Sequence, residues 1–185
     1  MRSDAARNHR AILRAAEDLL ESHGAEHVSL DRVAAAAGVG KGTVFRRFGS
    51  RTGLFQELLA DRAAALSQAI DSAESPLGPG SPPSERLALF LDALADLAGR
   101  NVALFSAHER ACAEDKYADP TYLRWHGHVR ALIAEARPDL DAEFLGHTLL
   151  ASFDGDLVRH VIAVGGVERL RASVRSLAAA LTFRP

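Results

Sequence analysis

The sequence predicts an all-α protein in which a small N-terminal domain precedes a larger helical bundle. Apolar residues recur at helical spacing along almost the whole chain, and alternating strand-like runs are absent. Only two tyrosines and one tryptophan are present. Glycine and proline punctuate the pattern into about nine helical segments. We expect the 185 residues to divide into domains at 1–50 and 51–185.

The first three expected helices are short and closely spaced. The first is predicted from about Asp4 to His23, with Gly24 placed to adopt a left-handed C-terminal cap. Ser29 has the character of an N-cap for a second helix, 30–37, which Gly38 closes. Val39 and Gly40 then form a tight connection to a third helix over 41–48. This is the spacing of a helix-turn-helix.

The remaining segments are predicted to be longer helices. A fourth helix follows Gly49 and Ser50, and the stretch 75–84 is expected to be an exposed loop because it holds four of the seven prolines. The five further helices are expected at roughly 84–99, 101–115, 119–136, 141–164 and 166–182.

Composition and charge limit the class of protein. The chain is 48% hydrophobic and 25% charged, which is ordinary for a soluble globular protein. No uncharged apolar run approaches the ~20 residues of a membrane-spanning helix, and the single cysteine, Cys112, cannot form an intrachain disulfide, so we expect a cytoplasmic protein. The net charge is −2, yet between Asp31 and Glu57 there is no acidic residue and there are five basic ones. That local excess favours a surface that faces phosphate, although a solvated basic face is the alternative.

The third helix carries the pattern typical of base recognition. Val44 and Phe48 lie four residues apart and are expected to pack on the first two helices, so Thr43, Arg46 and Arg47 must project outward. Arginine can bond bidentately to guanine and a threonine methyl can contact thymine in the major groove. Gly42 would let the helix approach DNA closely. The amides of this helix, with Lys41 and Arg51, suit phosphate contacts.

Residues 28–55, VSLDRVAAAAGVGKGTVFRRFGSRTGLF, resemble the signature of the tetracycline-repressor (TetR/AcrR) family. The resemblance implies a sequence-specific transcriptional regulator of about nine helices. It implies that Ser29 caps the second helix and contacts phosphate, and that Arg51 clamps the DNA backbone. It also implies that the DNA-facing residues are Lys41, Gly42, Thr43, Phe45 and Arg46. Gly40 and Phe45 stand where the family often has serine and tyrosine, and Arg46-Arg47 replaces a common His or Tyr pair.

A homodimer is expected because one recognition helix contacts too few bases for useful specificity. Two half-sites about 34–36 Å apart, or a multiple of that spacing, would then form a palindromic double-stranded operator. The family resemblance implies an interface built from the last two long helices, and the final one has an a/d spacing. Burial of the same residues inside one chain is the alternative. The predicted interface residues are Leu149, Phe153, Leu157, Val161, Val167, Leu170, Val174, Leu177 and Leu181.

The resemblance also implies a ligand pocket in the C-terminal bundle, so that an unidentified small-molecule effector releases a repressor from its operator. Few polar groups lie on the expected faces, which favours a largely apolar or aromatic effector. The candidate lining residues are Phe90, Phe105, His108, Trp125 and Phe153, and burial of each as ordinary core is the alternative that residue type favours.

Three other hypotheses remain open. The first is a metal-sensing regulator, because five histidines lie in the C-terminal region. No two of them are spaced i, i+4, however, so we predict no metal site and no cofactor. A nucleoid-type DNA binder without ligand control is the second. An enzyme using Cys112 and His108 is the third, and we predict no catalytic residue because nothing marks an oxyanion hole or an orienting carboxylate.

Overall fold

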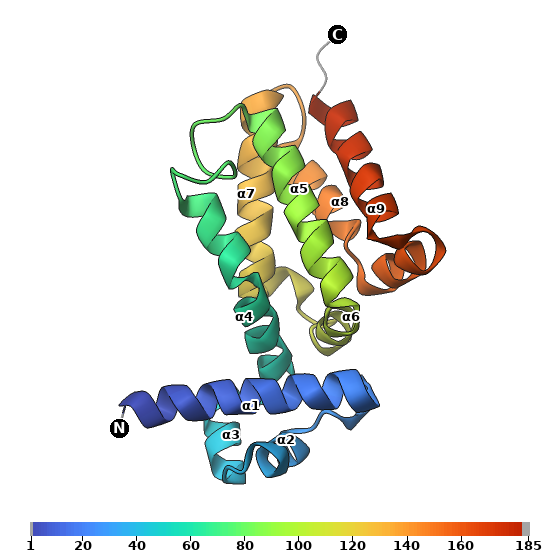
Figure 1. Ribbon diagram of the computed structural model, residues 1–185. Helices are drawn as coiled ribbons and strands as arrows, with labels where there is room; N and C mark the ends of the chain where they lie inside the picture. Colours follow the sequence, from blue (N-terminus) through green and yellow to red (C-terminus); the bar gives the residue numbers. More distant parts are fainter. Residues whose placement is uncertain (1, 183–185) are drawn as a thin grey trace. The chain divides into compact units, whose positions relative to one another are not determined.

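The computed structural model describes residues 2–182, and this part of the chain is helical without any β-strand (Figure 1). The prediction of an all-α fold is therefore confirmed. The helices are α1 (Arg2–His23), α2 (Leu30–Ala37), α3 (Lys41–Phe48), α4 (Arg51–Asp71), α5 (Pro83–Arg100), α6 (Val102–Ala111), α7 (Pro120–Ala136), α8 (Ala142–Ala151) and α9 (Gly155–Thr182). Two 3₁₀ turns, η1 (Ala25–His27) and η2 (Lys116–Ala118), lie between them.

The chain forms two compact units. The N-terminal unit comprises the chain up to Asp61 together with Ala103–Glu114, and the C-terminal unit comprises Arg62–Val102 and the chain from Asp115 onward. Helix α4 begins in the first unit and ends in the second. Whether residues 1–50 act as a separate functional domain stays a prediction.

The N-terminal unit is built on apolar faces of α1, α2, α3 and the start of α4. Ile12, Val33, Val44 and Leu54 are at most 1% exposed and belong to one core cluster. Leu104 and Ala107 of α6 belong to the same cluster. These contacts explain why helices of only eight residues persist, since isolated helices of that length are marginal in water.

The C-terminal unit is centred on α5. Helix α5 packs on α7 and α9, and α8 packs on α7 (Figure 1). Its core side chains are apolar and almost wholly buried, including Phe90, Leu91 and Leu94 from α5 and Leu132 and Ile133 from α7. Two ion pairs on the same side of α9 add to this packing, Arg171 with Asp96 and Arg175 with Asp92 of α5.

The observed helix ends agree with the predicted ones except in two places. The predicted helix 101–115 stops at Ala111. The predicted helix 141–164 is broken at residues 152–154, where the Asp154 carboxylate accepts hydrogen bonds from the amides of Asp156 and Leu157 at 3.1 Å each. The chain then continues as α9 through Gly166, whose φ of 70° and ψ of 178° kink the helix. The kink lies at the predicted boundary between 141–164 and 166–182.

Candidate nucleic-acid interface and sensing domain

Short capping interactions hold α2 and α3 in the helix-turn-helix arrangement. The Ser29 hydroxyl accepts a hydrogen bond from the Arg32 amide at 3.3 Å, as its predicted N-cap role requires. Gly38 ends α2 with φ at 66°, a left-handed conformation that glycine adopts without strain. The chain re-enters helical geometry at Lys41. The second and third helices thus have the predicted bounds.

The buried and exposed faces of α3 are sharply divided. Val44 is fully buried and Phe48 is 6% exposed, as the spacing predicts. On the other face Gly42, Phe45 and Arg46 are exposed. Phe45 is 50% exposed, so its ring is accessible on this face beside Arg46. With Gly40 and half-buried Thr43, these residues line a shallow hollow.

The two arginines at the end of α3 differ in their surroundings. The Arg47 Nε donates to His9 Nδ1 at 3.3 Å, and Arg47 Nη2 lies 3.8 Å from Glu57 Oε2. His9 itself stacks on the Phe48 ring with centroids 5.8 Å apart. Arg46, by contrast, makes no hydrogen bond or ion pair with any residue that the structure describes. Arg46 is therefore the free cation of this helix, whereas Arg47 is turned toward α1 and α4.

Two of the predicted phosphate-binding residues also have contacts within the protein. Lys41 Nζ lies 2.8 Å from Asp31 Oδ2, and both side chains are more than half exposed. The Arg51 Nε donates to the carbonyl of Val28 at 2.9 Å, and its Nη2 donates to the carbonyl of Ala25 at 2.5 Å. Arg51 also lies over the Phe55 ring, 5.1 Å from its centroid. The guanidinium thus ties the start of α4 to the chain before α2.

His9 is a residue of this surface that the sequence did not reveal. With Arg46 and Arg47 it lines a groove between α1 and α3, to which Ala6 and Asn8 also contribute. His9 is 38 residues from Arg47 in sequence, so no local pattern links them. Only the packing of α1 against α3 brings them together.

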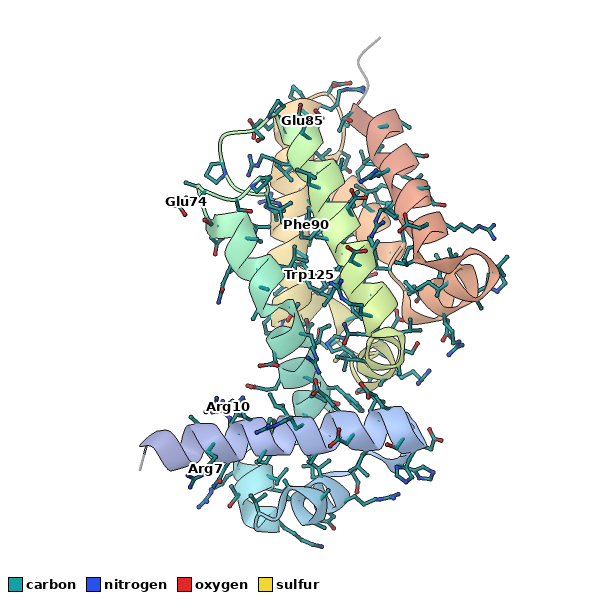
Figure 2. All side chains as sticks on the ribbon, viewed as in Figure 1. Arg7, Arg10, Glu74, Glu85, Phe90 and Trp125 are labelled. Carbon is teal, nitrogen blue, oxygen red and sulfur yellow. The ribbon has the colours of Figure 1, made fainter. Side chains whose placement is uncertain are left out.

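The five candidate ligand residues do not lie in one unit. Phe105 and His108 belong to α6 of the N-terminal unit, whereas Phe90, Trp125 and Phe153 are buried in the C-terminal unit, and Figure 2 labels two of them on α5 and α7. The Trp125 Nε1 is buried without a hydrogen-bond partner among the described residues. One helical turn further along α7, the same holds for His128 Nε2. His128 was not among the predicted ligand residues.

His128 is held in its neutral form. Its ring meets the Phe90 ring edge-on, with centroids 5.0 Å apart. Burial lowers the pKa of His128 from 6.5 to about 4, the nearby Arg86 and Arg124 act in the same direction, and Asp71 opposes them. Trp125 and His128 thus each have a buried polar atom without a hydrogen-bond partner among the described residues, which costs free energy unless a ligand or water satisfies it.

The residues of the predicted dimer interface fall into two groups. Leu149, Phe153, Leu170 and Val174 are at most 6% exposed within a single chain, because α8 and α9 pack on the other helices of their own unit. They have little surface left to offer a partner. Leu157 and Leu177 are 44% and 47% exposed. Val161, Val167 and Leu181 are partly buried.

Two further exposed apolar side chains, Phe144 and Val164, lie on the same two helices at 65% and 62%. They were not predicted to belong to the interface. Helices α8 and α9 therefore carry four large, exposed apolar side chains between them.

The thiol considered as a nucleophile is buried. Cys112 is 5% exposed, and its Sγ lies 3.6 Å from His108 Nε2. A small buried thiol is common in protein cores, so this contact alone does not favour a catalytic role. Within residues 2–182, no helix has the length and apolar character needed to cross a membrane.

Residues 12–58 match the model of the family described as bacterial regulatory proteins, tetR family. The matched segment runs from the core of α1 to the start of α4 and contains the whole of α2 and α3. No curated protein matches the chain.

Several solved structures share the fold over almost the full length of the chain. One is the transcriptional regulator FadR from Bacillus subtilis in complex with stearoyl-CoA, with a TM-score of 0.71, 14% identity, and coverage of 95% of this chain and 100% of that one. Another is FadR of Thermus thermophilus, a TetR-family repressor in complex with lauroyl-CoA, with a TM-score of 0.69, 18% identity, and 95% coverage of both chains. A TetR-like transcriptional regulator from Rhodococcus sp. RHA1 has a TM-score of 0.66, 20% identity, and coverage of 96% and 97%.

Proposed function

We propose that the chain, whose residues 12–58 match the tetR family of bacterial regulatory proteins, is a DNA-binding transcriptional regulator and acts as a homodimeric repressor. It binds a palindromic operator and is released by a small, largely apolar or aromatic ligand. The observation that carries this proposal is the exposed face of α3, where Gly42, Phe45 and Arg46 are accessible and Arg46 has no partner among the described residues.

The chemistry of this face suits the major groove. Arg46 has five donors available for guanine O6 and N7, and Phe45 and the Thr43 methyl group can contact thymine methyl groups. Ser29, Lys41, Arg47 and Arg51 flank the face and supply contacts to phosphate. Arg47 and Arg51 must do so with the donors that their internal hydrogen bonds leave over.

The homodimer is supported by the four exposed apolar side chains of α8 and α9. Contact with a second copy of the chain would bury these exposed Leu, Val and Phe side chains. In this proposal Phe144, Leu157, Val164 and Leu177 form the contact, with Val161, Val167 and Leu181 at its edge. Two DNA-reading units then reach half-sites about one helical turn apart, or a multiple of it.

The effector site is supported by Trp125 and His128. An apolar interior that contains two unsatisfied polar atoms fits a ligand with an apolar body and at least one hydrogen-bonding group. An acyl chain is one ligand of this kind, and two proteins of the same fold were solved with acyl-CoA. Release follows if the ligand binds better to the conformation that does not fit the operator.

The first experiment measures binding of the purified protein to DNA upstream of its own and neighbouring genes, against random competitor DNA and across a salt series. Tight, competitor-resistant binding of two or more protomers to a palindrome supports a specific regulator. Binding no better than to random DNA contradicts it and favours a nucleoid-type binder. Release of the specific complex by acyl-CoA or another apolar ligand, weakened in Trp125→Ala, tests the effector site.

A further inference from the structure

A cluster of two imidazoles and one carboxylate lies in the C-terminal unit, far in sequence from α2 and α3. His126 comes from α7, whereas Glu143 and His147 lie one turn apart on α8. Glu143 Oε1 lies 3.8 Å from His126 Nε2 and 3.7 Å from His147 Nε2. The two imidazole rings stack with centroids 3.8 Å apart. One potential ligand atom from each of the three side chains thus lies within 4.8 Å of the other two.

Local structure holds these three side chains in place. The Asp141 carboxylate caps α8 by accepting from the Phe144 amide at 3.1 Å, which fixes the helical turn that carries Glu143. Gly146 lies under the His126 ring, and a Cβ at this position would come within 3.0 Å of the imidazole Nε2. A glycine in mid-helix costs about 1 kcal/mol relative to alanine. This one makes room for the ring to lie against α8.

The outer contacts orient the ligand atoms. Tyr122 Oη and His147 Nδ1 are 2.5 Å apart, so the hydrogen bond leaves the Nε2 of His147 facing Glu143. Metal-bound histidines almost always use their second ring nitrogen in this way. Arg130 Nε lies 3.5 Å from the other carboxylate oxygen, Oε2, and leaves Oε1 to the histidines.

We propose that His126, Glu143 and His147 bind a divalent transition-metal ion such as Zn²⁺, with Tyr122 as the residue that positions His147. Two imidazoles and one carboxylate form a common ligand set for zinc and its neighbours, with water completing the coordination. Zinc–ligand distances of about 2.0–2.2 Å require the two Glu143–histidine separations to shorten by a few tenths of an ångström. The two imidazole rings, stacked at an interplanar angle of 15°, must also turn so that both Nε2 atoms point at the ion. His126 Nε2 would exchange its contact with the Glu143 carbonyl oxygen, at 3.1 Å, for the ion.

The ion would join α7 to the first turn of α8. Sequence spacing did not predict this site because its ligands are one i, i+4 Glu–His pair and a histidine from another helix, rather than two histidines at i, i+4. The binding of the ion does not depend on the proposed repressor function.

The test is a titration of the full-length, tag-free and chelator-treated protein with CoCl₂, followed by its visible ligand-field absorption. The expected result is saturation at one Co²⁺ per chain, without a thiolate charge-transfer band, and bleaching of the spectrum by one equivalent of ZnCl₂. Glu143→Gln should weaken Co²⁺ binding at least about tenfold, and His147→Gln should do the same. The Glu143 side chain is 61% exposed, so its substitution leaves the fold intact.

Three further variants distinguish Co²⁺ binding at this cluster from binding elsewhere on the chain. Tyr122→Phe should weaken binding about tenfold while leaving one site per chain, because it removes only the orienting hydrogen bond. His160→Gln, on an exposed histidine of α9, and Cys112→Ser should leave binding unchanged. Saturation that survives both Glu143→Gln and His147→Gln, loss of binding in Cys112→Ser, or absence of stoichiometric binding would overturn the proposal.

Discussion

Gly42 is the residue at which the needs of the fold and those of DNA binding can be separated. A Cβ at this position would meet nothing within 4 Å, so the protein itself does not require a glycine there. Gly42→Ala should therefore leave stability unchanged or raise it by up to about 1 kcal/mol. If α3 lies close to the DNA backbone, the added methyl group should lower operator affinity by about tenfold.

Thermal unfolding and fluorescence anisotropy with labelled operator measure the two effects. Gly127→Ala in α7, where a Cβ also meets nothing, is the matched control and should leave operator affinity unchanged. An unaltered affinity in Gly42→Ala would place this end of α3 away from the DNA.

Arg46 and Arg47 are neighbours in sequence with different expected roles. Arg46→Ala should cost about 1–3 kcal/mol of discrimination between operator and altered operators, because its donors are free to meet bases. Arg47→Ala should change discrimination less, since its guanidinium is engaged by His9 and Glu57. Competition binding with operators changed one base pair at a time distinguishes the two. Equal losses on specific and random DNA for Arg46→Ala would contradict its assignment to base reading.

At the scale of the elements, the sequence predicted the helix ends that are set by nearby residues. Ser29, Gly38 and Gly49 punctuate the chain, and α2 and α3 begin and end where those caps place them. The break before α9 has a local cause as well, Asp154 followed by Gly155, but it lies within an apolar pattern that continues across it. The contact of His9 with Arg47 and that of His126 with His147 depend on helix packing, which single-sequence periodicity does not report.

A prediction about a single element concerns Asp154, which caps the start of α9. Its carboxylate accepts from two amides at the start of α9, so Asp154→Ala should destabilise the protein by about 1 kcal/mol. Asp156→Ala, which removes an exposed ion pair with Arg159, should cost less. Urea unfolding at pH 7 compares them. Equal costs would mean that the carboxylate at 154 is not a significant cap.

At the scale of the whole molecule, the neutral His128 couples stability to pH. Its pKa in the folded protein is about 4, below the ordinary 6.5, so the unfolded chain binds more protons between these values. The contribution of His128 to the free energy of unfolding is therefore complete above about pH 6.5 and is lost as the pH falls toward 4. In His128→Gln this part of the pH dependence should disappear. Denaturant unfolding at pH 7 and pH 5 measures it, and an identical pH dependence in both proteins would contradict the assignment.

In the proposed function, operator binding by the whole molecule depends on dimerisation. Leu157→Glu and Leu177→Glu each place a charge on an exposed apolar side chain of α9 and leave the core of the subunit untouched. A charge buried without a partner in an interface is strongly unfavourable, so both variants should shift the protein to monomers at micromolar concentration. They should also lose tight binding to a palindrome while keeping weak binding to random DNA.

Sedimentation velocity and operator binding of the same preparations measure this pair of effects. Leu123→Glu is the matched control, since this leucine is 52% exposed but lies on α7 rather than on α8 or α9. If the α9 variants remain dimeric and the α7 variant dissociates, the dimer interface lies on α7 rather than on α9. If all three remain dimers that bind the palindrome tightly, neither leucine of α9 is at the centre of the interface.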